Sequence, residues 1–585
     1  MGLRSTWWPS KEEVVAENGM VTAKHPLAAE AGLGVLKRGG NAVDAAVATG
    51  FAICVVEPMM TSLGGCGIML VHQPQRGLTE VVDYLPRAPR GTQPEMFRVL
   101  EGPPSVAIAL YDTEGQENIE GHRSVTVPGT VAGLCLAHQR YGSRPLEELL
   151  EPAIHYAEQG FEVSWYLAAH IANAMPGLSR FPPSREVFLP GGFPPRFYPR
   201  PGHRLVQREL GQVLREIVLR GPEAFYRGDV AAAIAEEMRR NGGLLTEKDL
   251  AEYRAEVREP VRVSYRGAEV LAAPMAHGGT TLLQTLNILE HFDLWDLGHN
   301  SAEGLHLFIE AARHAFADRY HYLGDAGVVP VPLPALLSPA YARELAQAVD
   351  RRRAALEPEL GETEPWVFYS TRALHGPWKH QGAPAARPSS LTPSGPVGDG
   401  CTTHFNVVDR ERNLVSCTQT AVSVFGSKVV VPGTGVLLNN GMIWFNPKPG
   451  FVNSIAPWKR PLTNMAPVLV LRDGRPYLAE GAPGGRRIIN ANTQVLLNVL
   501  EFDMGVQEAI AQPRVDASAR LTLVDSRIPE PVREELRARG HNVEVVEESP
   551  GDTNFATPLG ILVDGEKGLV HGGVDTFRIA EARGY

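Results

Sequence analysis

The chain has 585 residues and a formal net charge of −10, with 44% hydrophobic and 21% charged residues, a composition typical of a folded globular protein. Its charges are spread along the sequence without the basic patch that marks a nucleic-acid-binding surface, so no nucleic-acid partner is expected. Five cysteines without a CxxC pair favour neither a disulfide framework nor a zinc site.

The N-terminal segment, residues 1–17, contains Trp, Pro and charged residues but no apolar run or small-residue cleavage site, so it does not resemble a signal peptide. The longest apolar run, Ala42–Val56, is shorter than a membrane span and contains Asp44. We interpret it as a buried helix that is capped by Asn41. We therefore expect a cytoplasmic protein that makes no membrane contact.

The first two-thirds of the chain predict mainly helices. A helix over Pro26–Arg38 ends at a Gly pair, and a Gly-rich turn after the second helix leads into two strands. The strands are Ile68–His72 and Glu80–Tyr84. The middle of the chain, from Val131 to about His321, is mostly helical and is interrupted by an extended segment, Val261–Ala272. Its clearest helices are Leu146–Gln159, Gly211–Arg220, Asp229–Asn241 and Ala302–Tyr322.

Residues 357–400 are rich in Pro, Gly, Ser and isolated charges, and this stretch is too long for an ordinary loop. After it the pattern changes to short strands separated by Gly turns. A run without regular structure, followed by a small polar residue that opens a strand, is what a self-cleaving precursor needs. The predicted elements here are strands Thr403–Asp409, Asn413–Ala421, Gly435–Asn440, Val468–Arg472 and Tyr477–Glu480, helix Arg487–Phe502, and a hairpin turning at Asp564-Gly565.

Cys401-Thr402 is the junction that we predict to be cleaved, and Thr402 is the predicted nucleophile. A hydroxyl is a weak nucleophile unless a base takes its proton. A Thr at a chain start carries such a base, its own α-amino group, whose pKa is ordinarily about 7.7–8.0. The same hydroxyl can first attack the Cys401 carbonyl to give an ester that hydrolyses. The alternative reading is that Thr402 is a β-branched residue at the start of a strand.

Three further positions carry weaker signals. Thr420 lies on the partner strand of the first hairpin, where its hydroxyl can orient Thr402, although a strand Thr on a solvated face is the plain alternative. Gly484 and Gly485 precede a helix, where backbone N–H groups can receive an oxyanion, or they form a simple turn. We interpret His404 as structural, because alternate residues of a strand face opposite sides.

Taken together, these stretches resemble the γ-glutamyltransferase (glutathione hydrolase) family of N-terminal-nucleophile hydrolases. The matching pieces keep the family's order along almost the whole chain. They are residues 39–46, 64–67, 127–129, 317–319, 322–325, 402–404, 437–440, 460–462, 483–485 and 584–585.

The resemblance implies an α+β fold, a four-layer αββα sandwich. It implies cleavage before Thr402 into a large subunit, residues 1–401, and a small catalytic subunit, residues 402–585, which stay associated as one intertwined domain. Residues 357–401 are then a flexible segment before the cleavage site. The resemblance also implies an acyl-enzyme on Thr402, resolved by water or an amine acceptor, with no metal or organic cofactor. Thr420 matches the family's hydroxyl partner, and Gly484 and Gly485 match its oxyanion donors.

The substrate-binding positions depart from the family pattern. Leu85 occupies the usual place of the Arg that holds the glutamyl carboxylate, and Arg87 follows two residues later. Thr463-Asn464 replace two Ser residues. After Asn440, Trp444 stands where an Asp usually binds the substrate's α-amino group. Gly441 and Val422 are two further replacements, and the chain between Trp444 and Arg460 is shorter than in members with a lid.

We therefore predict substrate contacts at Arg87, Asn440, Trp444, Thr463 and Asn464. The first hypothesis is a hydrolase of γ-glutamyl amides such as glutathione, in which hydrolysis dominates transfer because the site is lidless. The second keeps the chemistry but changes the substrate to glutaryl- or adipyl-type amides, as in cephalosporin acylases. The third is an uncleaved, non-catalytic relative that serves as a binding protein.

Overall fold

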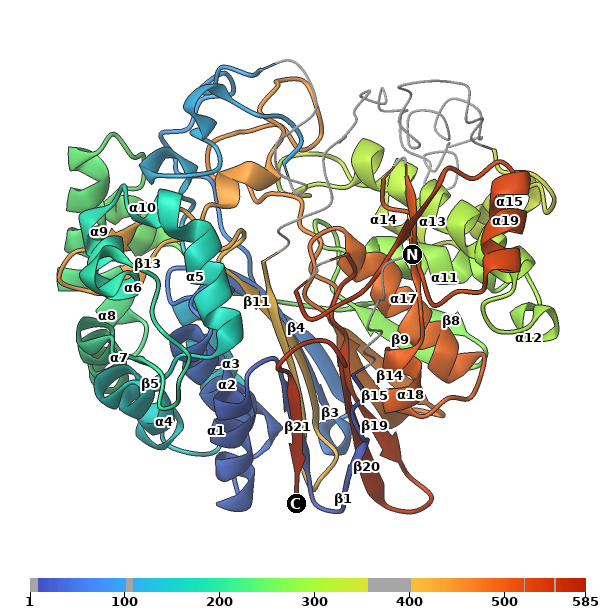
Figure 1. Ribbon diagram of the computed structural model, residues 1–585, viewed down its shortest axis with the longest axis horizontal. Helices are drawn as coiled ribbons and strands as arrows, with labels where there is room; N and C mark the ends of the chain where they lie inside the picture. Colours follow the sequence, from blue (N-terminus) through green and yellow to red (C-terminus); the bar gives the residue numbers. More distant parts are fainter. Residues whose placement is uncertain (1–8, 101–108, 356–400, 520, 552–553) are drawn as a thin grey trace.

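Two seven-stranded antiparallel sheets form the centre of the molecule and are covered on their outer sides by helices (Figure 1). The computed structural model describes residues 9–100, 109–355, 401–519, 521–551 and 554–585. The segment that we expect to be flexible before Cys401, residues 357–400, lies outside this set. The two stacked sheets with helices on both outer sides confirm the expected four-layer α+β sandwich.

The first sheet has the strand order β21-β2-β10-β11-β3-β4-β7, and the second has the order β1-β20-β19-β15-β14-β9-β8. The strands of the first sheet are Glu581–Gly584 (β21), Met20–Ala23 (β2), Thr403–Val408 (β10), Leu414–Thr420 (β11), Cys66–Gln73 (β3), Leu78–Tyr84 (β4) and Glu256–Arg258 (β7). Those of the second are Val14–Ala16 (β1), Leu569–Val574 (β20), Leu559–Asp564 (β19), Arg475–Gly481 (β15), Val468–Arg472 (β14), Ala268–Ala272 (β9) and Val261–Tyr265 (β8).

Helices of the N-terminal half cover the first sheet, and two groups from distant parts of the chain cover the second (Figure 1). The N-terminal group is Pro26–Lys37 (α1), Ala42–Val56 (α2), Thr130–Tyr141 (α3), Leu146–Gln159 (α4), Trp165–Leu178 (α5), Pro182–Phe188 (α6), Arg208–Arg220 (α7), Glu223–Tyr226 (α8), Asp229–Arg240 (α9) and Glu247–Glu252 (α10). The other side has Gly279–Leu289 (α11), Leu294–Leu297 (α12), Ala302–Tyr322 (α13), Leu333–Leu336 (α14), Pro339–Ala348 (α15), Arg487–Leu500 (α17), Val506–Ala511 (α18) and Glu530–Ala538 (α19).

Burial on both faces explains why the central strands are almost continuously apolar. In β3, Met69 and Val71 belong to the core under α1–α4, whereas Ile68 and Leu70 belong to the core between the two sheets. Successive side chains of a strand point to opposite faces, so a strand inside a four-layer sandwich must be apolar at every position.

The predicted elements agree with the structure except in two places. The expected strand Gly435–Asn440 is a strand only at Val436–Leu437 (β13), which pairs with Val430–Val431 (β12). The reason is that Gly435 has a positive φ of 64° and that Leu438 turns away to bridge Gly64. The extended segment Val261–Ala272 is a hairpin, because the chain reverses at a positive φ at Arg266 and Gly267.

The remaining strands form two small sheets at the periphery: Phe161–Glu162 (β5) with Arg204–Leu205 (β6), and Val515–Asp516 (β16), Thr522–Asp525 (β17) and Val543–Val546 (β18). The Asn41 cap of α2 is confirmed as a capping box with Asp44. Within the described ranges, no helix has the length and apolar character that crossing a membrane requires.

Candidate active site

The predicted cleavage junction lies in the interior of the molecule. Cys401 and Thr402 are 1% and 4% exposed, and the Cys401 thiol donates a hydrogen bond to the Met59 carbonyl. Directly after them, β10 pairs with β2 on one side and with β11 on the other. The peptide that joins Cys401 to Thr402 is therefore held at the end of a central strand, where its position is tightly determined.

Two threonine hydroxyls converge on the carbonyl of this peptide. The Thr402 hydroxyl donates to the Cys401 carbonyl oxygen at 2.5 Å, and the Thr420 hydroxyl donates to the same oxygen at 2.6 Å. The two hydroxyl oxygens are 3.5 Å apart. The hairpin register creates this meeting, because Thr403 pairs with Gln419 and so places Thr420 next to Thr402. The structure thus brings together the predicted nucleophile and its predicted hydroxyl partner.

The turn after β11 fixes the direction of the Thr420 hydroxyl. The backbone N–H of Val422 donates to the Thr420 oxygen at 2.8 Å, so this oxygen accepts from Val422 and donates to Cys401. Val422 holds a positive φ of 90°, a conformation that β-branched residues rarely adopt. Strained backbone of this kind persists only where the surroundings hold it in place. At this site it orients a hydroxyl.

A buried lysine approaches the other side of Thr402, and the sequence analysis did not single it out. The Lys24 ammonium donates to the Thr402 carbonyl at 3.5 Å and to the Tyr166 hydroxyl at 3.4 Å. It also lies 3.6 Å from a carboxylate oxygen of Glu57, whose pKa is raised by burial. A lysine directly after the apolar strand β2 was the available signal, but its partners lie far away in sequence.

His404 lies between the two sheets. Its Nδ1 is 2.9 Å from the Thr418 hydroxyl, and its Nε2 is 3.0 Å from the Asn406 side-chain oxygen. Burial lowers the pKa of this imidazole to about 3. The ring packs closely against β15, since a Cβ on Gly481 would come within 2.3 Å of it. The interpretation of His404 as a structural residue agrees with this position.

The predicted oxyanion glycines connect β15 to α17. Gly484 and Gly485 have φ values of 146° and 62°, and a Cβ on Gly484 would lie 2.5 Å from Cα of Ala556. Glycine is therefore required at position 484 for both conformation and space. The β15 strand touches the His404 ring at Gly481, and the turn begins three residues later, at Gly484. The glycine pair therefore follows a strand that contacts β10, and the role of its N–H groups stays a prediction.

Arg87 is held in a network of opposite charges. Its guanidinium donates to Glu256 at 3.0 Å and to the Trp458 carbonyl at 2.8 Å, and it lies 4.0 Å from Asp325. Burial, and the nearby positive charge of Arg460, lower the pKa of Arg87. A substrate carboxylate at this guanidinium therefore has to compete with Glu256.

Comparison with known proteins decides the family. The family model described as Gamma-glutamyltranspeptidase matches residues 28–585. The chain belongs to the γ-glutamyltranspeptidase family. This confirms the resemblance drawn from its motifs and makes the chain an enzyme of a hydrolase family.

Some relatives of this chain are named acylases and others are named glutathione hydrolases. The "Acylase ACY 1 proenzyme" of Pseudomonas sp. (strain SE83) is 40% identical over 535 residues, 91% of this chain and 88% of that protein. The "Glutathione hydrolase proenzyme" of Bacillus subtilis (strain 168) is 36% identical over 576 residues, 98% of this chain and 92% of that protein. The crystal structure of cephalosporin acylase from Bacillus halodurans superposes with a TM-score of 0.83 at 28% identity, covering 100% of this chain and 99% of that one.

Asn440, which matches the γ-glutamyltranspeptidase pattern, and the two departures that follow it, Gly441 and Trp444, are well packed. The Asn440 amide accepts from the Ser423 N–H at 3.0 Å and donates to the Ile119 carbonyl at 2.7 Å, so it fastens the loop that follows Thr420. Trp444 ends the 3-10 turn Gly441–Trp444 (η7) and is 8% exposed. A Cβ on Gly441 would meet the Thr126 hydroxyl at 2.2 Å, which explains the glycine.

Thr463 and Asn464 are held by a buried arginine. Arg319 donates to the Thr463 carbonyl and, at 3.0 Å, to the Asn464 side-chain oxygen. Burial lowers the pKa of Arg319 to about 10. Because Arg319 engages the Asn464 oxygen, the amide nitrogen of Asn464 is the group that can turn toward a substrate. The roles of Thr463 and Asn464 in substrate binding stay predictions.

Proposed function

We propose that this chain is a self-processing threonine amidohydrolase, which cleaves itself between Cys401 and Thr402 and then uses Thr402 as an N-terminal nucleophile. The convergence of the Thr402 and Thr420 hydroxyls on the Cys401 carbonyl oxygen, at 2.5 and 2.6 Å, carries this proposal. Residues 1–401 and 402–585 are then two subunits that remain together.

In the proposed cleavage, the Thr402 hydroxyl oxygen attacks the Cys401 carbonyl carbon and loses its proton. The Thr420 hydroxyl donates to the oxygen on which negative charge develops. The C–N bond then breaks, the nitrogen takes a proton, and an ester joins Cys401 to the Thr402 side chain. Water hydrolyses this ester, leaving a carboxylate on Cys401 and a free α-amino group on Thr402.

In the proposed turnover, this α-amino group takes the proton from the Thr402 hydroxyl as that oxygen attacks a substrate amide. The amine leaves, an acyl-enzyme remains on Thr402, and water or an amine acceptor resolves it. Gly484 and Gly485 supply backbone N–H groups to the oxyanion. We expect hydrolysis to dominate transfer, because the chain between Trp444 and Arg460 is short.

The acyl group favoured by the site is a glutaryl- or adipyl-type chain without an α-amino group. One observation supports this choice: Trp444 is buried at the position where the family usually has an Asp. A site without a partner for an ammonium does not select a substrate that carries one. Relatives named as acylases support the same choice, and hydrolysis of γ-glutamyl compounds such as glutathione is the second candidate, supported by relatives with that name.

The first test follows the intact mass of the purified chain. The wild type should give fragments 1–401 and 402–585, and Thr402→Ala should stay a single chain. A wild-type chain that remains uncut and inactive would contradict the proposal and favour a non-catalytic binding protein.

The second test compares two anilides on the cleaved enzyme, one with a glutaryl group and one with a γ-glutamyl group, which differ only in the α-amino group. A kcat/KM ratio near one, or a preference for glutaryl, is the expected result. A preference for γ-glutamyl of about 100-fold, equal to about 2.7 kcal/mol, would show that an ammonium site survives and that the enzyme is a glutathione hydrolase.

A further inference from the structure

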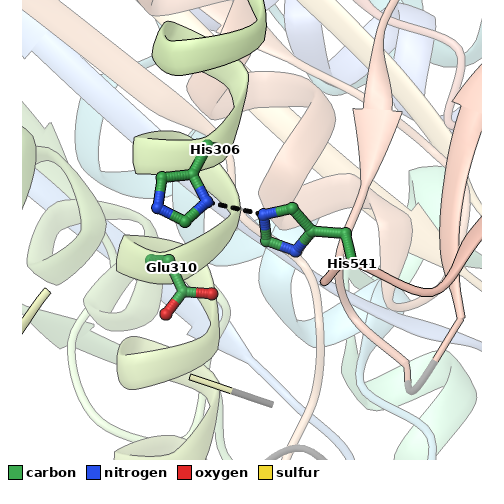
Figure 2. A group of neighbouring side chains, drawn as sticks. All are labelled: His306, Glu310 and His541. Carbon is green, nitrogen blue, oxygen red and sulfur yellow. Dashed lines mark hydrogen bonds between the residues drawn. The ribbon is translucent and has the colours of Figure 1, made fainter. Parts of the chain in front are cut away.

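Three buried side chains that can bind a metal meet between α13 and the turn that follows α19 (Figure 2). They are His306, Glu310 and His541, which are 0%, 0% and 3% exposed. Each offers one ligand atom, and these atoms all lie within 4.8 Å of one another. The family resemblance implied no metal, and no metal-ligand spacing stood out in the sequence; the two histidines are 235 residues apart.

The backbone explains how the three side chains meet. His306 and Glu310 are four residues apart on α13 and therefore lie on the same face of the helix. His541 follows α19, where Gly540 has a φ of 96°, and the N–H of His541 bonds the Leu536 carbonyl. This is a Schellman C-terminus, in which the left-handed glycine reverses the chain. The reversal turns His541 back toward α13, against which α19 packs.

One imidazole already has the tautomer that a metal ligand needs. His306 Nε2 lies 2.7 Å from the Asp350 carbonyl oxygen, which can only accept, so this nitrogen carries the proton. His306 Nδ1 then presents its lone pair to His541 Nε2, 2.7 Å away. A second-shell carbonyl that fixes the other ring nitrogen is the usual arrangement around a metal-bound histidine.

The pair leaves one buried polar atom unsatisfied. His541 Nε2 must donate to His306, so His541 Nδ1 carries a lone pair, and this atom has no hydrogen-bond partner among the described residues. If the His541 proton moves from Nε2 to Nδ1, His306 Nδ1 and His541 Nε2 each direct a lone pair into the space between the rings. The number of protons on the pair does not change. A cation at that point replaces the hydrogen bond between the rings.

The distances require only a small adjustment. Two nitrogens on a tetrahedral Zn²⁺ at about 2.0–2.1 Å lie about 3.3 Å apart, so the rings must separate by about 0.6 Å from the present 2.7 Å. The Glu310 carboxylate supplies the oxygen ligand, and the Ala355 N–H donates to it at 3.2 Å.

The charges around the pair partly balance. Arg313 and Arg539 lie near His541. The negative charges of Glu303 and Asp350 act on His306.

We propose that His306, Glu310 and His541 form a site for a divalent transition metal of the Zn²⁺ type, with a fourth position for water. The metal ties α13 to the turn after α19 and steadies residues Asp350–Ala355, whose backbone contacts two of the ligands. If the proposed cleavage before Thr402 occurs, the metal also joins the two subunits. The link between the two subunits rests on the proposed function, whereas the ligand set does not.

The test measures zinc in the full chain, purified with a removable tag that contains no histidine. After chelation, the protein is equilibrated with Zn²⁺, excess metal is removed, and bound metal is determined by mass spectrometry. We expect one equivalent per chain and a rise in Tm on Zn²⁺ addition. Co²⁺ should give the visible bands of a tetrahedral site. Thr402→Ala should bind equally well, which separates the metal site from the cleavage chemistry.

Two variants remove one ligand each, and a third serves as control. Glu310→Gln and His541→Gln should weaken Zn²⁺ binding by more than about 100-fold, the upper end for loss of a second-shell residue. His299→Gln removes a half-buried histidine that bonds Asn498 and should leave binding unchanged. Substoichiometric zinc in the wild type, or equal binding in all three variants, would overturn the proposal. If His541→Gln does not fold, Glu310→Gln and the Co²⁺ spectrum decide.

Discussion

The carbonyl oxygen of Cys401 receives two hydroxyl hydrogen bonds, and in the proposed cleavage Thr402 and Thr420 have different roles. Thr402 belongs to the same peptide as its acceptor, so its hydroxyl is the group that can attack. Thr420 comes from the neighbouring strand and is oriented by the Val422 N–H, so its hydroxyl is fixed as a donor. A fixed donor stabilises a developing oxyanion without reorganising.

Thr420→Val is therefore predicted to slow self-cleavage by about 10²–10³-fold, the usual loss when one oxyanion donor is removed. The change keeps the shape of the side chain and removes only the hydroxyl. The rate is measured from the ratio of intact to cleaved chain over time. Thr493→Val, which removes a buried hydroxyl bonded to the Ile489 carbonyl in α17, is the control and should cleave normally. Equal rates for both variants would contradict the assignment.

The buried His404 makes stability depend on pH on the acid side. The folded-state pKa is about 3, below the ordinary value of 6.5. Between these two values the unfolded chain binds a proton that the folded chain does not. His404 therefore costs stability as the pH falls through this window, by about 1.4 kcal/mol per pH unit at most.

His404→Gln should reduce the loss of Tm between pH 7 and pH 5, even if it lowers the Tm at pH 7, since Gln does not titrate. The measurement uses the uncut Thr402→Ala chain, so that unfolding does not separate two subunits. His571→Gln, which changes a histidine paired with Glu13 at the surface, serves as the comparison. An unchanged pH dependence in His404→Gln would show that the imidazole is protonated in the folded state.

At the scale of elements, the two hydroxyls of the candidate site come from the ends of β10 and β11, and the proposed oxyanion glycines follow β15. The β10–β11 register sets the distance between the two hydroxyls, and β15, which contacts β10, leads into the turn of Gly484 and Gly485. Gly484 has a positive φ and no room for a Cβ beside Ala556. The turn is thus determined by packing as well as by conformation.

Gly484→Ala is predicted to lower both the Tm and the turnover of the cleaved enzyme, because the added methyl group must push back the Ala556 backbone. Overpacking of this kind costs about 1–3 kcal/mol. Gly474→Ala is the matched control, since Gly474 has a φ of 70° but nothing within 4 Å of an added Cβ. If both variants lose the same stability and keep full activity, then space at Gly484 is not the constraint and the turn does not serve catalysis.

At the scale of the whole molecule, both sheets mix strands from the two sides of the junction. β10 and β11 lie between β2 and β3 of the first sheet, and β14 pairs with β9 in the second. Separating the fragments 1–401 and 402–585 would expose the hydrogen-bonding edges of central strands and both apolar cores, which is very costly.

The two fragments should therefore elute as one particle in size exclusion under native conditions, at the volume of uncut Thr402→Ala. They should separate only in denaturant. Separate elution of the fragments in buffer would mean that the sheets do not hold them, and the interleaved topology would not explain the assembly.

Local sequence determined much of the secondary structure and pointed to the proposed cleavage junction. The capping residue Asn41 and the apolar run after it define α2, and the Asp473-Gly474 pair defines the turn between β14 and β15. The change of pattern at Thr402 marked the junction. These signals act over a few residues, so no distant partner is needed to read them.

Only the tertiary structure decided which side chains meet. The pairing of Arg87 with Glu256, the approach of Lys24 to Thr402, and the convergence of His541 with His306 all join distant parts of the chain. The strand expected over Gly435–Asn440 was cut short for the same reason, since Leu438 bridges Gly64. Sequence patterns report the preferences of a residue and its neighbours, whereas contacts between distant segments depend on how the layers pack.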